Sequence, residues 1–153
     1  MKTRLGKIIF AILFLLPVCA NAIITKDFYY DGQIVDGDYF NKVNVWNTAT
    51  VNMTGGSVPD NVIVHNSATF NFSGGNPGWI SALDNSTANI TGGFSAVSVG
   101  DNATGNISGN ANVADASTGG SGTLNIYGGT IDVQLYSWQE LIGDSHPFFL
   151  TSH

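Results

Sequence analysis

Hydrophobic and polar residues alternate in short stretches along most of the chain, and one such stretch returns five times. The copies read TVNMTGG, TFNFSGG, TANITGG, TGNISGN and TLNIYGG, at residues 50–56, 69–75, 87–93, 104–110 and 123–129. Their asparagines follow one another at intervals of 19, 18, 17 and 19 residues. A nearly constant period of this length is typical of a fold built from units that pack on their neighbours.

Each copy predicts a β-strand with one buried face, because its apolar residues recur at every second position. The positions expected to face inward hold Val51 and Met53, Phe70 and Phe72, Ala88 and Ile90, Gly105 and Ile107, and Leu124 and Ile126. The Gly-Gly pair that usually follows permits positive φ and therefore a tight corner. A second apolar stretch comes next, such as VIV at 62–64 and VSV at 97–99. Asn or Asp then gathers at Asn66, Asp84-Asn85 and Asp101-Asn102, where left-handed backbone is best tolerated.

These strands predict an all-β fold, since no stretch shows the 3.6-residue period over a helical length. Two short strands per unit could also pair as antiparallel hairpins. Stacking of successive units explains more, because like residues then lie one rung apart, about 4.8 Å, where asparagine and aliphatic columns are each self-compatible. We therefore expect a parallel β-helix (β-solenoid) of about five coils with repeats of 17–19 residues, spanning residues 43–136.

Units of the form T-x-N-[IF]-[ST]-G-G, followed by a short apolar strand and an Asp/Asn-Ser corner, resemble the β-helical repeats of bacterial surface proteins. The resemblance covers about residues 43–136 and is closer to secreted proteins with a PEP-CTERM sorting tail than to autotransporter passenger domains. It implies a right-handed β-helix and export to the cell surface. The chain departs from the PEP-CTERM pattern at its end, which has no Pro-Glu-Pro motif, terminal apolar helix or arginine cluster. Either the chain is a truncated member of the class, or the interpretation of a sorting tail does not apply to it.

Residues 1–22 have the pattern of a secretory signal peptide. Lys2, Arg4 and Lys7 form a basic start, an apolar run follows at 8–18, and Ala-Asn-Ala at 20–22 supplies a cleavage site. Cleavage there would remove the only cysteine and leave no membrane anchor. We therefore expect a secreted or cell-surface protein that is exported by the bacterial Sec route.

The expected mature chain is strongly acidic. It keeps Lys26 and Lys42 against all eleven acidic residues, a net charge of −9 with histidine neutral. Such a chain repels polyanions, so we exclude nucleic acid as a partner. Residues 23–42 lack the repeat and are rich in aromatic residues and aspartate, which predicts an N-terminal cap over the first open edge. Residues 137–153 are interpreted as a C-terminal tail or cap.

The outward positions of the repeated strand predict a polar surface of stacked like residues. A threonine column and an asparagine column lie side by side: Thr50 and Asn52, Thr69 and Asn71, Thr87 and Asn89, Thr104 and Asn106, and Thr123 and Asn125. A third column holds Thr54, Ser73, Thr91, Ser108 and Tyr127. This face is similar to the hydroxyl arrays of ice-binding solenoids and would equally suit sugar or protein contacts. A purely structural interpretation is that threonine favours strands and asparagine ladders stabilise stacks. Tyr127 and the uneven unit length argue against a regular lattice.

Carboxylates are the main catalytic candidates, because the three histidines lack ligand spacing and no serine-hydrolase elbow occurs. They recur about once per unit, as Asp60, Asp84, Asp101, Asp115 and Asp132. Two of them on neighbouring rungs could act as acid and base, or their oxygens could hold Ca²⁺ weakly. Most are corner residues, however, and the expected mature chain has no arginine. We therefore expect no enzyme activity, no metal site and no cofactor.

Together these features predict a non-catalytic structural or adhesive module of the cell surface or extracellular matrix. Its partners would be a surface polysaccharide or other surface proteins. The alternatives are a face that binds sugar, Ca²⁺ or ice and, less in keeping with the pattern, a polysaccharide-processing enzyme. A binding face predicts one flat side of ordered threonine and asparagine, whereas an enzyme predicts carboxylates that converge in a groove.

Overall fold

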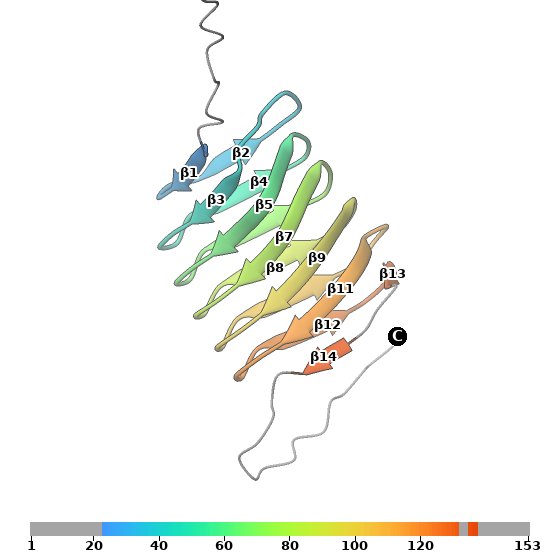
Figure 1. Ribbon diagram of the computed structural model, residues 1–153. Coiled ribbons are helices and arrows are strands. Elements are labelled where there is room, and N and C mark those ends of the chain that lie inside the picture. The colour runs from blue at the N-terminus through green and yellow to red at the C-terminus, as the bar shows by residue number, and fades with distance from the viewer. Residues whose placement is uncertain (1–22, 132–134, 138–153) are drawn as a thin grey trace, which may run out of the picture.

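The computed structural model describes residues 23–131 and 135–137, and its regular elements are all β-strands. No helix long and apolar enough to cross a membrane is found among these residues. The strands form two parallel sheets whose rungs stack along one axis, as Figure 1 shows. This is the parallel β-solenoid that the repeats predict. The predicted signal peptide (1–22) and nearly all of the predicted C-terminal tail (137–153) lie outside the described residues.

The two sheets alternate along the chain, so each turn of the solenoid gives one strand to each. Sheet A has eight strands in the order β1-β3-β5-β7-β9-β11-β13, with β14 also pairing with β11, and sheet B has six in the order β12-β10-β8-β6-β4-β2. Sheet A consists of β1 (Thr25–Phe28), β3 (Lys42–Val45), β5 (Ser57–Val64), β7 (Asn76–Ala82), β9 (Phe94–Val99), β11 (Asn112–Thr118), β13 (Thr130–Ile131) and β14 (Leu135–Ser137). Sheet B consists of β2 (Gly32–Ile34), β4 (Thr50–Met53), β6 (Thr69–Phe72), β8 (Thr87–Ile90), β10 (Thr104–Ile107) and β12 (Thr123–Ile126).

The predicted N-terminal cap, residues 23–42, contains strands of both sheets. β1 pairs with β3 and β2 pairs with β4, both in parallel, and Gln33 lies opposite Asn52. Residues 25–34 therefore form a further coil, and the six strands of sheet B make six turns where about five were expected. The segment GQIVDG at 32–37 agrees in character with VNMTGG at 51–56 only at its second, third and last positions, which is why the repeat is hard to recognise there.

The first turn nevertheless covers the N-terminal end of the core, as a cap would. Ile34 is fully buried although it belongs to this terminal turn. Phe28 and Phe40 pack against the core. The ring of Phe28 fills the space beside Gly32, where a Cβ atom would overlap it. Residues of a regular turn thus shield the end of the solenoid.

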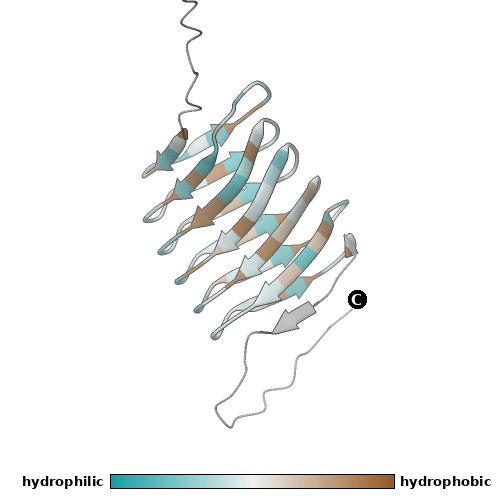
Figure 2. Cartoon of the chain, viewed as in Figure 1, coloured by the Kyte–Doolittle hydropathy of each residue, from teal (hydrophilic) through white to brown (hydrophobic). Residues whose placement is uncertain are grey.

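The core lies between the sheets and consists of stacked apolar columns (Figure 2). On sheet B the predicted inward residues of β4, β6 and β8 are buried, and those of β12 are partly buried. On sheet A the buried residues include Val43, Val45, Val62, Val64, Ile80, Ala82, Val97 and Val99. Residue sizes are matched between the sheets. A Cβ at Gly105 would lie only 2.7 Å from Val99 Cγ2 and 2.9 Å from Leu124 Cδ1, so neighbouring side chains already fill this place.

The Asn/Asp corners adopt the left-handed backbone that was predicted for them. Asn66, Asp84 and Asp101 have φ of 57°, 59° and 52°, and Asn47, which the sequence did not single out, has φ of 63°. The side chains of Asn66, Asp84 and Asp101 each also accept a hydrogen bond from the corner residue one turn earlier. The backbone N–H of Asn66 donates to Asp84 Oδ2 (2.7 Å), and that of Asp84 donates to Asp101 Oδ2 (3.1 Å). The corner residues are therefore required both for the turn and for the bonds between turns.

Candidate functional site

The ten predicted ladder residues lie together on the outer surface of sheet B, and we name them the Thr/Asn face. The five threonines are direct neighbours in register: Thr50↔Thr69, Thr69↔Thr87, Thr87↔Thr104 and Thr104↔Thr123. The five asparagines are paired in the same strands: Asn52↔Asn71, Asn71↔Asn89, Asn89↔Asn106 and Asn106↔Asn125. All are half-buried except Thr123, which is exposed. The structure thus brings together every member of the predicted set.

The asparagine column is a continuous hydrogen-bonded ladder. Each Nδ2 donates to the Oδ1 of the asparagine one turn earlier: Asn71 to Asn52 (2.8 Å), Asn89 to Asn71 (2.8 Å), Asn106 to Asn89 (2.8 Å) and Asn125 to Asn106 (2.9 Å). A side-chain amide has two N–H groups and an oxygen with two lone pairs. An interior asparagine uses one N–H and one lone pair within the ladder. It therefore retains one N–H and one lone pair for contacts outside the chain.

The third predicted column lies beside this ladder. The backbone N–H groups of its members donate to the inward residue of the preceding turn: Thr54 to Ile34, Ser73 to Met53, Thr91 to Phe72, Ser108 to Ile90 and Tyr127 to Ile107. The five positions are therefore equivalent in successive turns. Tyr127 is the exception in size, and its side chain is exposed. The column is small and hydroxylic over four turns and aromatic in the fifth.

Uneven unit length does not disturb this surface, contrary to what the sequence suggested. The pairings of β2, β4, β6, β8, β10 and β12 run without a register shift. Register shifts occur instead in sheet A, between Val58 and Asn61 and between Val113 and Asp115. One further residue is accommodated in the corner between β10 and β11, since Ile107 pairs with Ile90 but Asn112 pairs with Phe94. The extra residues thus lie outside sheet B, and the Thr/Asn face keeps the regular spacing of its rungs, about 4.8 Å.

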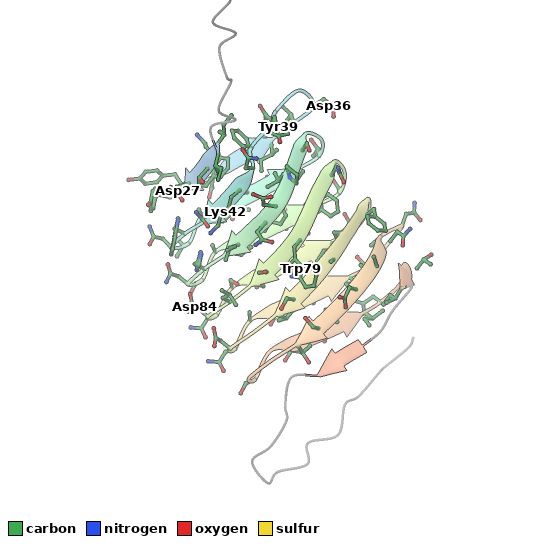
Figure 3. The ribbon with its side chains drawn as sticks, viewed as in Figure 1. Asp27, Asp36, Tyr39, Lys42, Trp79 and Asp84 are labelled. Carbon is green, nitrogen blue, oxygen red and sulfur yellow. The ribbon has the colours of Figure 1, made fainter. Side chains whose placement is uncertain are left out.

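The catalytic carboxylate candidates occupy different parts of the coil. Asp84 and Asp101 are the left-handed corner residues described above, and Figure 3 shows Asp84 at that corner. Asp60 and Asp115 belong to sheet A strands at the register shifts. Asp132 lies outside the described residues. Over 23–131 and 135–137, no group of three or more histidine, cysteine or acidic side chains is placed to hold a metal ion.

A stack of rings that the sequence did not predict follows the edge of the first three turns. Trp46 and His65 are nearly parallel, with ring centroids 3.8 Å apart and an interplanar angle of 5°. Tyr29 continues the stack, 6.4 Å from Trp46 at 13°. Trp46 and His65 each stand directly before a left-handed corner asparagine. The recurrence of an aromatic residue directly before this asparagine is the sequence signal that could have predicted the stack of rings.

Two titratable groups belong to this edge. Asp27 Oδ1 accepts hydrogen bonds from Asn44 Nδ2 (2.8 Å) and Trp46 Nε1 (3.3 Å), and these bonds hold the pKa of Asp27 below its usual value. Burial lowers the pKa of His65, because the charged imidazolium loses solvation; the carboxylate of Asp84 acts in the opposite direction. Neither group lies on the Thr/Asn face, whose members are all uncharged.

Searches against protein-family models, curated proteins and solved structures found no match for the chain. The fold is therefore established by strand register and topology. The role of the Thr/Asn face has to be inferred from its geometry.

Proposed function

We propose that the chain is a secreted, non-catalytic β-solenoid of the bacterial cell surface or extracellular matrix, with a structural or adhesive role. The observation that carries this proposal is the Thr/Asn face, a neutral hydrogen-bonding surface in register over five turns. The signal-peptide pattern of residues 1–22 supports export. The resemblance of the repeats to those of bacterial surface proteins supports the surface location.

The Thr/Asn face is suited to contact with an extended partner. Its side chains are short and already held in columns, so little conformational entropy is lost when a partner binds. Each interior asparagine offers one free N–H and one lone pair, and each threonine offers a hydroxyl. A surface polysaccharide or another surface protein could match such a row of groups along the solenoid axis.

Adhesion through this face is tested by co-sedimentation with insoluble cellulose and chitin as neutral polysaccharide probes. The test variant is Thr87→Tyr, which places a bulky ring in the middle of the face. Its control is Ser81→Tyr, an outward, half-buried position of the same turn on sheet A. We expect Thr87→Tyr to weaken sedimentation by about tenfold, a loss of about 1.4 kcal/mol of binding free energy, and Ser81→Tyr to leave it unchanged. Equal weakening by both variants would contradict the assignment of the face.

Export is tested separately by the mass of the protein recovered from culture medium and cell surface. Cleavage after Ala22 gives a chain that begins at Ile23. Recovery of only the uncleaved chain inside the cell would contradict the secreted location.

Binding to ice is a second candidate, favoured by the uninterrupted register of sheet B. A surface that repeats at one fixed spacing suits a partner that is itself periodic, and the face carries no charge that would need compensation. The test is incorporation of the fluorescently labelled protein into a growing ice crystal, with Thr87→Tyr and Ser81→Tyr as before. Exclusion of the wild-type chain from ice would remove this candidate and leave the adhesive role standing.

A further inference from the structure

One inward column of sheet A is aliphatic in five turns and basic in the first. Register pairs place in this column Lys26, Val43, Val62, Ile80, Val97 and Ala116. The four residues from Val43 to Val97 in this series are fully buried, and Ala116 is nearly so. Lys26 is exposed, and its Nζ lies 5.2 Å from the centroid of the Phe28 ring. A charged side chain therefore stands where the pattern of the core calls for valine.

This lysine lies on an open edge of the solenoid. Within the described sheets β1 and β2 each have a neighbouring strand on one side only. An unpaired strand edge presents free N–H and C=O groups and is a template for pairing with another chain. Among the residues that the structure describes, the same turn also carries six of the eight exposed large apolar side chains: Ile23, Ile24, Tyr29, Tyr30, Val35 and Tyr39. The N-terminal end thus has both main-chain and apolar groups that favour association.

We propose that Lys26 prevents a second copy of the chain from pairing with this end of the solenoid. The ammonium group of Lys26 lies over the Phe28 ring, and the side chain is exposed to water. If a second copy added its own first turn to this edge, the ammonium would be trapped between two cores. Removing an unpaired charge from water opposes that pairing.

Asp27 of the second copy could not neutralise this charge. In a pair that continues sheet A, residues opposite each other point to the same side of the sheet. Lys26 points inward, in register with buried Val43, whereas Asp27 points outward, in register with Asn44. Lys26 would therefore meet an inward residue of the second copy, either Lys26 or Phe28. Both meetings leave the ammonium without a carboxylate.

The test removes the charge in the full chain and measures molar mass by size-exclusion chromatography with light scattering over a range of concentrations. Lys26→Met removes the charge but keeps an unbranched side chain, and Lys26→Val installs the residue found in the next two turns. The matched control is Lys42→Met on β3, which Figure 3 shows beside β1 and which belongs to an outward column. We expect both Lys26 variants to double in molar mass as concentration rises, and the wild type and Lys42→Met to stay monomeric.

Circular dichroism shows whether each variant keeps its β-structure. If Lys26→Val does not fold, the molar mass of Lys26→Met alone tests the proposal. A folded Lys26→Met that remains monomeric overturns the proposal. Equal association of Lys42→Met also overturns it, because the loss of any positive charge would then suffice. A continuous series of larger species overturns the assignment to this end, since one end per chain can form only a closed pair.

Discussion

The hydrogen-bonded ladder makes a quantitative prediction at Asn89, in its middle. The amide of Asn89 donates to Asn71 and accepts from Asn106, both at 2.8 Å. Asn89→Ala removes both bonds, and at about 1 kcal/mol for each neutral bond the free energy of unfolding falls by about 2 kcal/mol. Asn52→Ala, at the start of the ladder, removes only the bond accepted from Asn71 and costs about 1 kcal/mol. Because both changes are Asn to Ala at the same strand position, the change in strand propensity is shared.

The measurement is equilibrium unfolding in urea, followed by circular dichroism and evaluated with a common slope. Thr87→Ala and Thr50→Ala lie on the same two strands but outside the ladder. The difference between their losses of unfolding free energy shows how much more a middle turn is destabilised than an early turn for reasons other than the ladder. After subtraction of that difference, Asn89→Ala should cost about 1 kcal/mol more than Asn52→Ala. Equal costs for the two asparagine variants would refute the reasoning, because the number of ladder bonds would then have no effect on stability.

Three further predictions concern residues away from the Thr/Asn face. Ser95 is fully buried and its Oγ has no hydrogen-bond partner. Ser95→Val should therefore raise the free energy of unfolding, measured by urea titration, by about 1 kcal/mol. A decrease in that free energy would contradict the prediction. The lowered pKa of His65 means that the folded state favours the neutral ring. The melting temperature should therefore decrease as the pH is lowered from about 6.5, and the His65→Gln variant should lose that part of the pH dependence. Because the pKa of Asp27 is lowered in the folded state, its carboxylate stabilises the fold at pH values above its usual pKa, about 3.9. This contribution should disappear on acidification and should be absent at every pH in the Asp27→Asn variant.

The solenoid could be predicted from the sequence because its strands pair in register with copies of themselves. Once the asparagines at 52, 71, 89, 106 and 125 were aligned, the neighbouring columns followed, and the structure pairs the strands as that alignment requires. The left-handed corners were predictable for the same reason, since Asn and Asp are the residues that tolerate such backbone. Local chemistry and repetition pointed to the same structure.

The remaining features depend on packing between turns. Gln33 occupies the asparagine column of the first turn, but few other residues of that turn follow the repeat, so its strands were not predicted. The stack of Trp46 on His65 becomes visible only when register places them in adjacent rungs. The inward direction of Lys26 likewise follows from its pairing with Val43. Uneven spacing of the asparagines gave no indication that the extra residues are accommodated in sheet A and at a corner, outside sheet B.

The uniform direction of the asparagine ladder has a consequence for how such a protein can change in length during evolution. Every asparagine within the ladder brings one donor for the turn before it and one acceptor for the turn after it. Duplication or deletion of a whole unit therefore leaves no broken bond inside the column. Gain or loss of a single residue in a sheet B strand would instead reverse its inward and outward faces. Genes for this kind of chain should vary mainly by whole units, with single-residue changes confined to sheet A and to the corners.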